Sequence, residues 1–225
     1  TLSRNPFAWN RHFGLLFVDS PLSTGFSTAS SLADIPTNQP IIAEHILTVL
    51  QSFYALNLAL RTEPFFLTGG IYMGKYIPTA GAHILDTNRE LPEVLRVNLR
   101  GGGADTGPAV GRGDGRAGAG VVVVAEHDEA GRAVQLCKAV GLRTPPLNRV
   151  GGKAAMGACG DVAWEECSHE VGTAMQADVM CSVVPQVESL LLEHDMHVAI
   201  PGRPRPLGRR RATEAWPDGV RWDGL

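Results

Sequence analysis

Two adjacent glycines separate a short apolar run from a stretch of helical composition, and this junction constrains the fold more than any other feature of the sequence. The apolar run covers residues 64–68, and Gly69 and Gly70 follow it directly. Short apolar runs bounded by turn residues are typical of buried strands. The sequence therefore predicts a strand, a tight turn and then a helix that continues up to Pro78.

Two further segments upstream predict a sheet flanked by helices. Residues 15–18 form another apolar run, ended by Asp19, Ser20 and Pro21, which suits a buried strand of a mostly parallel sheet. Apolar side chains then recur at helical spacing over residues 41–55, after a proline near the first turn. We expect an α/β fold in which the strands at residues 15–18 and 64–68 share one sheet.

Composition and charge exclude several classes of partner. The chain has 225 residues, is 44% hydrophobic and carries a net charge of −3, which allows a buried core and gives no general attraction to nucleic acid or anionic membranes. The longest apolar run, around residues 120–125, is far shorter than the roughly 20 residues that span a bilayer. No basic start followed by an apolar stretch opens the chain, so we expect no signal peptide within it.

Changes in composition divide the chain into three segments. Residues 1–101 read as a folded core segment, residues 102–149 as a divergent glycine-rich segment, and residues 150–225 as a C-terminal segment with an arginine- and proline-rich tail. A stretch rich in glycine buries little apolar surface, so residues 102–120 are expected to be poorly ordered. Residues 161–192 predict two helices broken at Pro185.

No cofactor or metal site is expected from the cysteines or the glycine motifs. The spacing of the four cysteines matches no zinc pattern, and two disulfides or free thiols are equally open. The G-x-G-x-x-G run at residues 113–118 precedes a predicted strand, whereas a dinucleotide-binding turn follows one. The Arg-Gly-Asp tripeptide at residues 112–114 and the arginines at 209–211 are interpreted as a chance match and a solvated tail. The cysteines are Cys137, Cys159, Cys167 and Cys181.

Two histidines are candidates for acid–base chemistry. His45 falls in the predicted helix and His83 follows the glycine junction, but a general base must lie within hydrogen-bond reach of its proton, which sequence does not fix. Placement in the core or on the surface is the favoured interpretation for both. The run Cys167-Ser168-His169 is not favoured as a thiol site either, because neighbours in sequence rarely form a nucleophile and base pair.

Several specific sequence motifs resemble those of the serine carboxypeptidase family, in particular those of a plant-type subgroup. The run TGGIYMGKYIP at residues 68–78 is similar to the family's TGESYAGKYIP, and NPFAWNRHFGLLFVDSP is similar to N-P-x-x-W-N-x-x-x-x-L-L-F-x-D-x-P. The resemblance covers roughly residues 4–101 and 146–198 and the last dozen residues. It implies an incomplete α/β-hydrolase fold, in which the glycine junction is the nucleophile elbow.

The resemblance assigns roles at the elbow that this sequence only partly keeps. Ile71 stands at the position of the nucleophilic serine, and Gly70 replaces a glutamate that helps to hold the carboxylate of the substrate. The backbone N–H of Tyr72 is expected to be one oxyanion donor. Gly69 and Gly74 are the elbow glycines.

Other parts of the family's site are expected outside the chain or are altered in it. A glycine-rich oxyanion segment, which also supplies the usual disulfide partner of Cys167, is implied upstream of Asn5, and the triad histidine beyond Leu225. The triad aspartate is expected at residues 198–202, which read VAIPG. The similarity to the family's motifs is lost abruptly near residues 102 and 201, which suggests damage to the reading frame. Comparing the three reading frames of the encoding DNA would test this hypothesis.

We therefore predict a serine carboxypeptidase-like protein without an intact nucleophile, acid or base. The alternatives are a pseudoenzyme that binds a peptide or a protein partner, and a residual hydrolase or acyltransferase. The resemblance implies a peptide ligand and a secreted or vacuolar location. The oligomeric state is not indicated.

Overall fold

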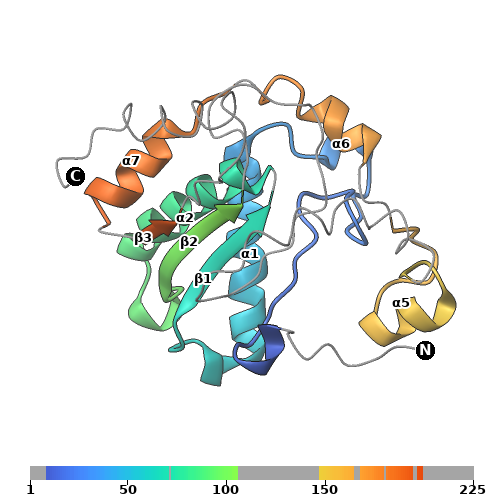
Figure 1. Cartoon of the computed structure of the whole chain (residues 1–225), viewed down its shortest axis with the longest axis horizontal. Helices are drawn as coiled ribbons and strands as arrows, with labels where there is room; N and C mark the ends of the chain where they lie inside the picture. The colour runs from blue at the N-terminus through green and yellow to red at the C-terminus, as the bar shows by residue number, and fades with distance from the viewer. Residues whose placement is uncertain are drawn as a thin grey trace, which may run out of the picture.

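The computed structural model of the chain contains one sheet of three parallel strands (Figure 1). It describes residues 9–70, 72–105, 147–164, 168–179, 181–194 and 197–199. Strand β2 (Leu99–Asp105) lies at the centre, between β1 (Phe65–Gly70) and β3 (His197–Ala199). The parallel pairing confirms the predicted α/β class.

Helices cover the sheet and extend away from it. In Figure 1, α1 and α2 lie behind the sheet, α7 lies near β3, and α5 lies at the opposite side of the molecule from α7. Helix α2 contacts α1, β1, β2 and α7. No helix in the described residues is long and apolar enough to cross a membrane. The helices are α1 (Gln39–Leu56), α2 (Met73–Glu90), α5 (Val150–Met156), α6 (His169–Ala174) and α7 (Val184–Leu192), with 3-10 turns η1 (Trp9–Arg11), η2 (Leu32–Asp34), η3 (Leu58–Leu60) and η4 (Glu93–Leu95).

One hydrophobic core joins early and late parts of the chain. Apolar side chains of α1, β1 and α2 make up most of it, and buried residues from the last third of the chain complete it. The late contributors are Val171, Met175 and Leu190, each at most 1% exposed. Burial of such side chains is the main favourable term in folding, so residues 169–192 fold onto the same core as α1 and α2.

Helix α1 forms where the apolar spacing predicts it. The Asn38 side chain caps its first turn, with Oδ1 accepting a hydrogen bond from the Ile41 N–H at 3.2 Å. Pro40 occupies the first turn, where a missing N–H costs nothing. Ile42, Ile46 and Leu50 recur every four residues and are buried on one face.

The predicted strand at residues 15–18 is wrong. The segment is extended, with Leu16 and Val18 packed against the core and Phe17 62% exposed. This alternation is what an extended chain over a core produces. A strand also needs a neighbour to exchange hydrogen bonds with, and in the described residues the sheet contains only β1, β2 and β3.

The helix after the glycine junction is longer than predicted. Helix α2 does not end at Pro78 but continues to Glu90, with the proline inside it. A proline inside a helix removes its own N–H bond to the carbonyl four residues earlier, and its ring crowds that carbonyl. The turns that follow bury Ala80 and Ile84 in the core, and this burial outweighs the lost bond.

Two predictions for later segments also need correction. Residues 102–105, expected to be poorly ordered, form part of β2, with Gly102 paired to Leu67 and Gly103 to Thr68. Because β2 has a neighbouring strand on each side, backbone hydrogen bonds hold it in place without contributions from side chains. The two helices predicted for residues 161–192 are present as α6 and α7, but the break between them lies before Pro185, which occupies the first turn of α7. The expectations for residues 106–146 and 201–225 lie outside the described residues.

Candidate functional site

Strand β1 and helix α2 lie on either side of the predicted elbow. Strand β1 ends at Gly70 and α2 begins at Met73. The strand and the helix approach so closely that a Cβ on Gly69 would lie 2.4 Å from the Met73 Cγ. Only glycine fits there without a shift of the helix. Gly74 is buried in the first turn of α2, and Ile71 lies outside the described residues.

Tyr72 is held at both its backbone and its side chain. Its carbonyl accepts hydrogen bonds from the N–H groups of Lys75 at 2.9 Å and Tyr76 at 3.4 Å. Its hydroxyl donates to Asp178 Oδ2 at 3.3 Å, and its ring packs against that of Tyr76 with centroids 5.0 Å apart. The expected oxyanion donor therefore belongs to a residue with little freedom to rotate.

Both tyrosines stay protonated well above the usual range. Burial raises the pKa of Tyr72, and the charge of Asp178 and its hydrogen bond raise it further. Burial also raises the pKa of Tyr76, with smaller contributions from Tyr72 and Asp178. Burial disfavours the phenolate, as does a nearby carboxylate. The Tyr72 hydroxyl is thus a donor at every physiological pH.

A buried ion pair lies beneath the elbow, and sequence reasoning missed it. The Lys75 side chain is 0% exposed, and its Nζ lies 3.0 Å from Asp178 Oδ2. The same ammonium group donates to the backbone carbonyl of Asp178 and to that of Val179, the latter at 3.4 Å. An ammonium group has three protons to donate, and these three acceptors match them.

The Asp178 carboxylate also caps helix α1. Gln39, the first residue of that helix, donates from its backbone N–H to Asp178 Oδ1 at 3.3 Å and from Nε2 to Oδ2 at 2.6 Å. A carboxylate at a helix N-terminus interacts favourably with the helix dipole. No local pattern in the sequence marks this contact, because Gln39 and Asp178 are 139 residues apart.

The two candidate histidines are not brought to the elbow. His83 lies in α2, eleven residues beyond Tyr72, which is about 16 Å along a helix that rises 1.5 Å per residue. His45 lies in α1, and its Nδ1 is buried without a hydrogen-bond partner in the described part of the chain. His169 begins α6, and its neighbour Cys167 lies outside the description.

Three other side chains lie close enough to share a metal ion. Ligand atoms of Asp86, Glu193 and His194 are within 4.8 Å of one another. Arg89 already neutralises the carboxylates, with Nη1 at 3.2 Å from Asp86 and 3.7 Å from Glu193. His194 Nε2 lies 3.1 Å from Asp86 Oδ1. As it stands, this set is an ion-pair cluster that joins the C-terminal ends of α2 and α7.

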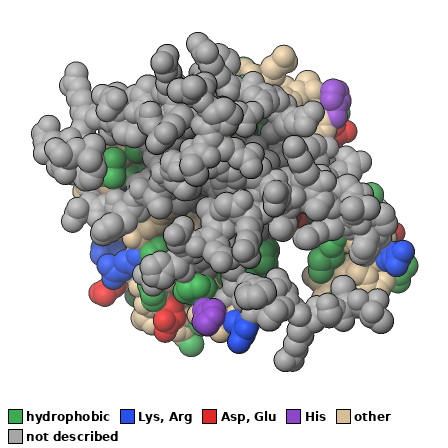
Figure 2. Space-filling view, in the orientation of Figure 1, with side chains coloured by type: hydrophobic (Ala, Val, Ile, Leu, Met, Phe, Trp, Pro, Cys, Tyr) green, Lys and Arg blue, Asp and Glu red, His purple; other side chains and the backbone are tan. Residues whose placement is uncertain are grey.

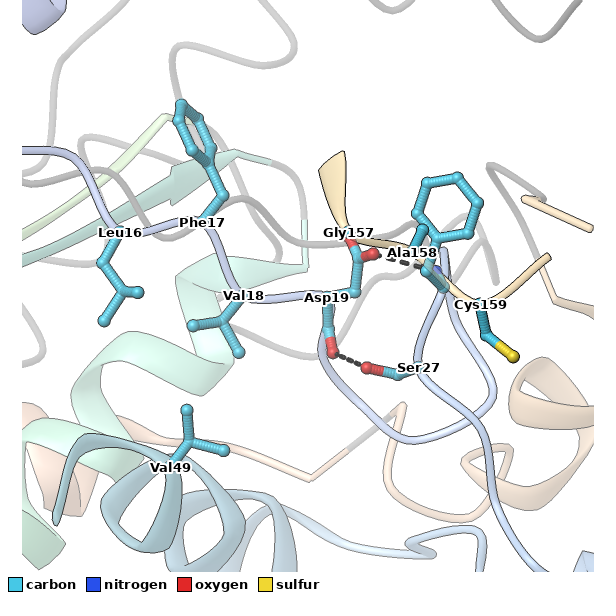
Figure 3. Close-up of a pocket in the computed structure, with 10 residues that line it drawn as sticks. Leu16, Phe17, Val18, Asp19, Ser27, Val49, Gly157, Ala158 and Cys159 are labelled. Atoms are coloured by element: carbon cyan, nitrogen blue, oxygen red, sulfur yellow. Dashed lines mark hydrogen bonds between the residues drawn. The ribbon is translucent and has the colours of Figure 1, made fainter. Parts of the chain in front are cut away.

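An open groove of about 410 Å³ runs between the extended N-terminal segment and the end of α5 (Figure 3). Leu16 and Val18 point toward α1 in this view, and Phe17 points the other way. The loop beside them is held by Asp19, whose Oδ2 accepts from the Phe26 N–H at 2.9 Å. The lining residues are Leu16, Phe17, Val18, Asp19, Phe26, Ser27, Val49, Gly157, Ala158 and Cys159.

The loop beside the groove requires a glycine at position 25. Gly25 has a φ of +58°, and a Cβ there would lie 2.3 Å from the Asp19 Cγ. The Ser27 hydroxyl donates to the Asp19 carbonyl at 2.6 Å. Residues 24–27 are therefore arranged around Asp19.

The charges of the described surface do not form a patch of one sign on the face in Figure 2. Acidic and basic side chains lie next to one another near its lower edge. Mixed charges of this kind give no extended field for steering a polyanion.

Residues 197–199 form the strand β3 beside β2. This strand was expected near the position of the family's aspartate. Ile200 and the residues that follow lie outside the description, so the sequence VAIPG alone indicates the absence of an acid there.

Comparisons with known proteins agree with this geometry. A family model described as serine carboxypeptidase matches residues 1–106. Serine carboxypeptidase-like 50 of Arabidopsis thaliana is 33% identical over 100% of this chain and 60% of its own length. A probable serine carboxypeptidase, CPVL, of Dictyostelium discoideum is 37% identical over 45% of this chain and 20% of its own.

A solved structure shares the fold. The crystal structure of a prohormone-processing carboxypeptidase from Saccharomyces cerevisiae matches with a TM-score of 0.69 and 14% identity, covering 92% of this chain and 59% of that one. The chain thus spans about three fifths of the length of the Arabidopsis relative and of this carboxypeptidase. With its elbow, its parallel sheet and its similarity to a plant relative along its whole length, the chain belongs to the serine carboxypeptidase-like family.

Proposed function

We propose that this chain is a serine carboxypeptidase-like protein that does not hydrolyse peptides by the serine mechanism of its family. The observation that carries this proposal is position 71, in the turn between β1 and α2, where the sequence has isoleucine. An isoleucine side chain offers no nucleophilic atom. The elbow is retained as a scaffold, with Gly69 still in close approach to Met73, but without the attacking group.

The residues around position 71 support the same conclusion. Gly70 has no carboxyl group with which to hold the C-terminus of a substrate. The sequence VAIPG at residues 198–202 has no acid to orient a catalytic histidine, and a histidine without its aspartate loses about 10⁴ in kcat in the serine proteases where this was measured. These deficits concern different steps of the reaction.

The proposal is tested by assaying the purified chain and Ile71→Ser side by side. We expect neither protein to release a C-terminal amino acid from a blocked dipeptide at acidic pH. We also expect no fluorophosphonate label on the wild-type chain at position 71. Turnover by the wild-type chain would overturn the proposal. Turnover by the Ile71→Ser variant alone would reveal a base already in place, with His45 and His83 the first residues to substitute.

Binding of a peptide without turnover is a second candidate function, and the open groove favours it. The groove is lined by polar and apolar surface in similar measure and includes the exposed ring of Phe17 beside the polar loop at Asp19. Small-ligand and peptide sites commonly combine an apolar lining with a few polar groups. The peptide ligand that the resemblance implies is assigned to this groove as part of the candidate.

A thermal-shift series tests the binding candidate. The purified chain is mixed with peptides that end in a free carboxylate, and we expect binding to raise its Tm. Phe17→Ser should abolish the shift, whereas Leu32→Ser, at a residue 69% exposed and outside the groove, should leave it unchanged. The absence of any shift, or equal shifts with both variants, would exclude peptide binding in this groove.

The location and partners of the protein follow from the same proposal. A secreted or vacuolar location is proposed from the family resemblance, with a peptide as ligand and without a nucleic-acid or membrane partner. Cell fractionation with an antibody to the native protein tests it. Recovery of the protein in the cytosol would contradict it.

A further inference from the structure

The Asp178 carboxylate collects donors from three segments that are far apart in the sequence. Oδ2 accepts from Gln39 Nε2 at 2.6 Å, from Lys75 Nζ at 3.0 Å and from the Tyr72 hydroxyl at 3.3 Å. Tyr72 and Lys75 precede it by 106 and 103 residues. One side chain after α6 therefore ties together the start of α1, the elbow turn and the first turn of α2.

Burial makes this contact obligatory. Lys75 is 0% exposed and Asp178 only 5%. A buried ammonium or carboxylate without a partner costs far more free energy than a buried neutral group. The three hydrogen bonds of Lys75 all end on Asp178 or on its neighbour Val179, so these two residues determine where the start of α2 lies.

The Tyr72 side chain gives the contact a specific consequence for the elbow. Tyr72 is the residue immediately before α2, and its carbonyl receives the first N–H bonds of that helix. Its ring packs on Tyr76, whose own hydroxyl has no hydrogen-bond partner in the described residues. The bond from the Tyr72 hydroxyl to Asp178 is thus the polar contact that orients this pair of rings.

We propose that Asp178 is a positioning residue for the elbow, which acts through Tyr72 and Lys75 to hold the turn and the first N–H groups of α2 in place. The inference does not depend on whether the chain hydrolyses or binds peptides. It assigns the segment after α6 a role at a turn from which it is separated by more than a hundred residues.

A general contribution to stability is the competing explanation, and it predicts a different pattern of hydrogen exchange. If Asp178 only stabilises the whole fold, its loss speeds exchange through global unfolding and affects α1, β1 and the elbow together. If it positions the elbow, its loss opens a local unit while the rest keeps its protection. Native-state hydrogen exchange read by mass spectrometry on peptides separates these outcomes.

The experiment compares Asp178→Asn and Tyr72→Phe with the wild-type chain. In both variants we expect amides at residues 72–76 to lose protection by about tenfold or more, while α1 and β1 lose less than about twofold. Asp86→Asn is the matched control, because it removes an exposed carboxylate from α2. It should change the protection neither of residues 72–76 nor of α1 and β1. Tyr72→Phe keeps the ion pair and removes only the hydroxyl contact, so it remains informative if Asp178→Asn fails to fold.

Two results would overturn the proposal. One is a uniform loss of protection in α1, β1 and the elbow, which would assign Asp178 to general stability. The other is unchanged protection at residues 72–76 in Tyr72→Phe, which would show that the hydroxyl contact does not position the turn.

Discussion

The two ends of α2 both carry ion pairs to the C-terminal part of the chain, yet they differ in burial. At the N-terminal end, Lys75 and Asp178 are paired in the interior, with side chains 0% and 6% exposed. At the C-terminal end, Arg89 pairs with Asp86 and Glu193, and all three side chains are more than half exposed. The same chemistry thus occurs once away from water and once in contact with it.

This contrast in burial indicates which contact the fold depends on. Exposed pairs are screened by water and salt and contribute about 0–1 kcal/mol. A buried pair has given up its hydration, so removing one partner leaves a charge that nothing compensates. Loss of an ion-pair partner at the elbow end of α2 is therefore expected to destabilise the fold strongly, whereas the same loss at the other end is expected to have little effect.

Lys75→Met should destabilise the protein more than any other change considered. It leaves the Asp178 carboxylate buried without its ammonium partner, and breaking a buried pair in this way costs about 3–5 kcal/mol. Urea unfolding followed by circular dichroism measures the change in the free energy of unfolding. Lys75→Met combined with Asp178→Leu removes both charges but leaves the buried donors of Gln39 and Tyr72 unpaired, so we expect it to recover only part of the loss. A loss below about 1 kcal/mol for the single variant would erase the contrast between the two ends of α2.

The next effect is expected for Gly69→Ala at the same end. An added Cβ would meet the Met73 Cγ at 2.4 Å, and overpacking of this kind costs about 1–3 kcal/mol. Gly151→Ala in α5 is the matched control, because no atom lies within 4 Å of its Cβ position. That control should stabilise the protein by up to about 1 kcal/mol, since alanine favours a helix more than glycine does. Equal effects of the two changes would show that the elbow is not tightly packed.

Local sequence patterns predicted the elements whose stability is local. The helix over residues 41–55 was predicted from its apolar spacing, and the strand before the glycine junction from its apolar run, although β1 extends through Gly69 and Gly70, where a turn was predicted. The strand at residues 15–18 failed, because pairing depends on a neighbour that an apolar run does not reveal. Pro78 was taken as the end of a helix, but core contacts of Ala80 and Ile84 carry α2 past it.

The residues of the candidate site also differ in whether local sequence reveals them. Ile71 and Gly70 were identified from a contiguous word, so the sequence alone located them. The contact of Lys75 with Asp178 spans 103 residues, and a single lysine in an otherwise ordinary helix gives no sign of burial. Long-range polar contacts of this kind become visible only when the fold brings the segments together.

A smaller effect is expected from the tyrosines at the elbow end. Burial raises the pKa of Tyr72 above its ordinary value of 10.0, so the unfolded chain releases this proton at a lower pH than the folded chain. The contribution is fully present below pH 10 and is lost as the pH rises toward the folded pKa. We expect the wild-type chain to lose stability above about pH 10, and Tyr72→Phe to lose it less steeply, by up to about one proton per molecule. Urea unfolding at several alkaline pH values measures both slopes, and identical slopes would contradict the burial of the Tyr72 hydroxyl.

Arg89→Ala, at the exposed end of α2, should change stability least. Its guanidinium lies 3.2 Å from Asp86 and 3.7 Å from Glu193, but each side chain is more than half in contact with water. Pairs of this kind contribute about 0.2–1 kcal/mol, and less at high salt because the charges are screened. We expect urea unfolding to show a loss within this range at low salt and almost none in about 1 M sodium chloride. A loss as large as that of Lys75→Met, unaffected by salt, would mean that the ends of α2 do not differ as their burial indicates. In that case His194, whose side chain is only 7% exposed and lies 3.1 Å from Asp86, would be the next residue to substitute.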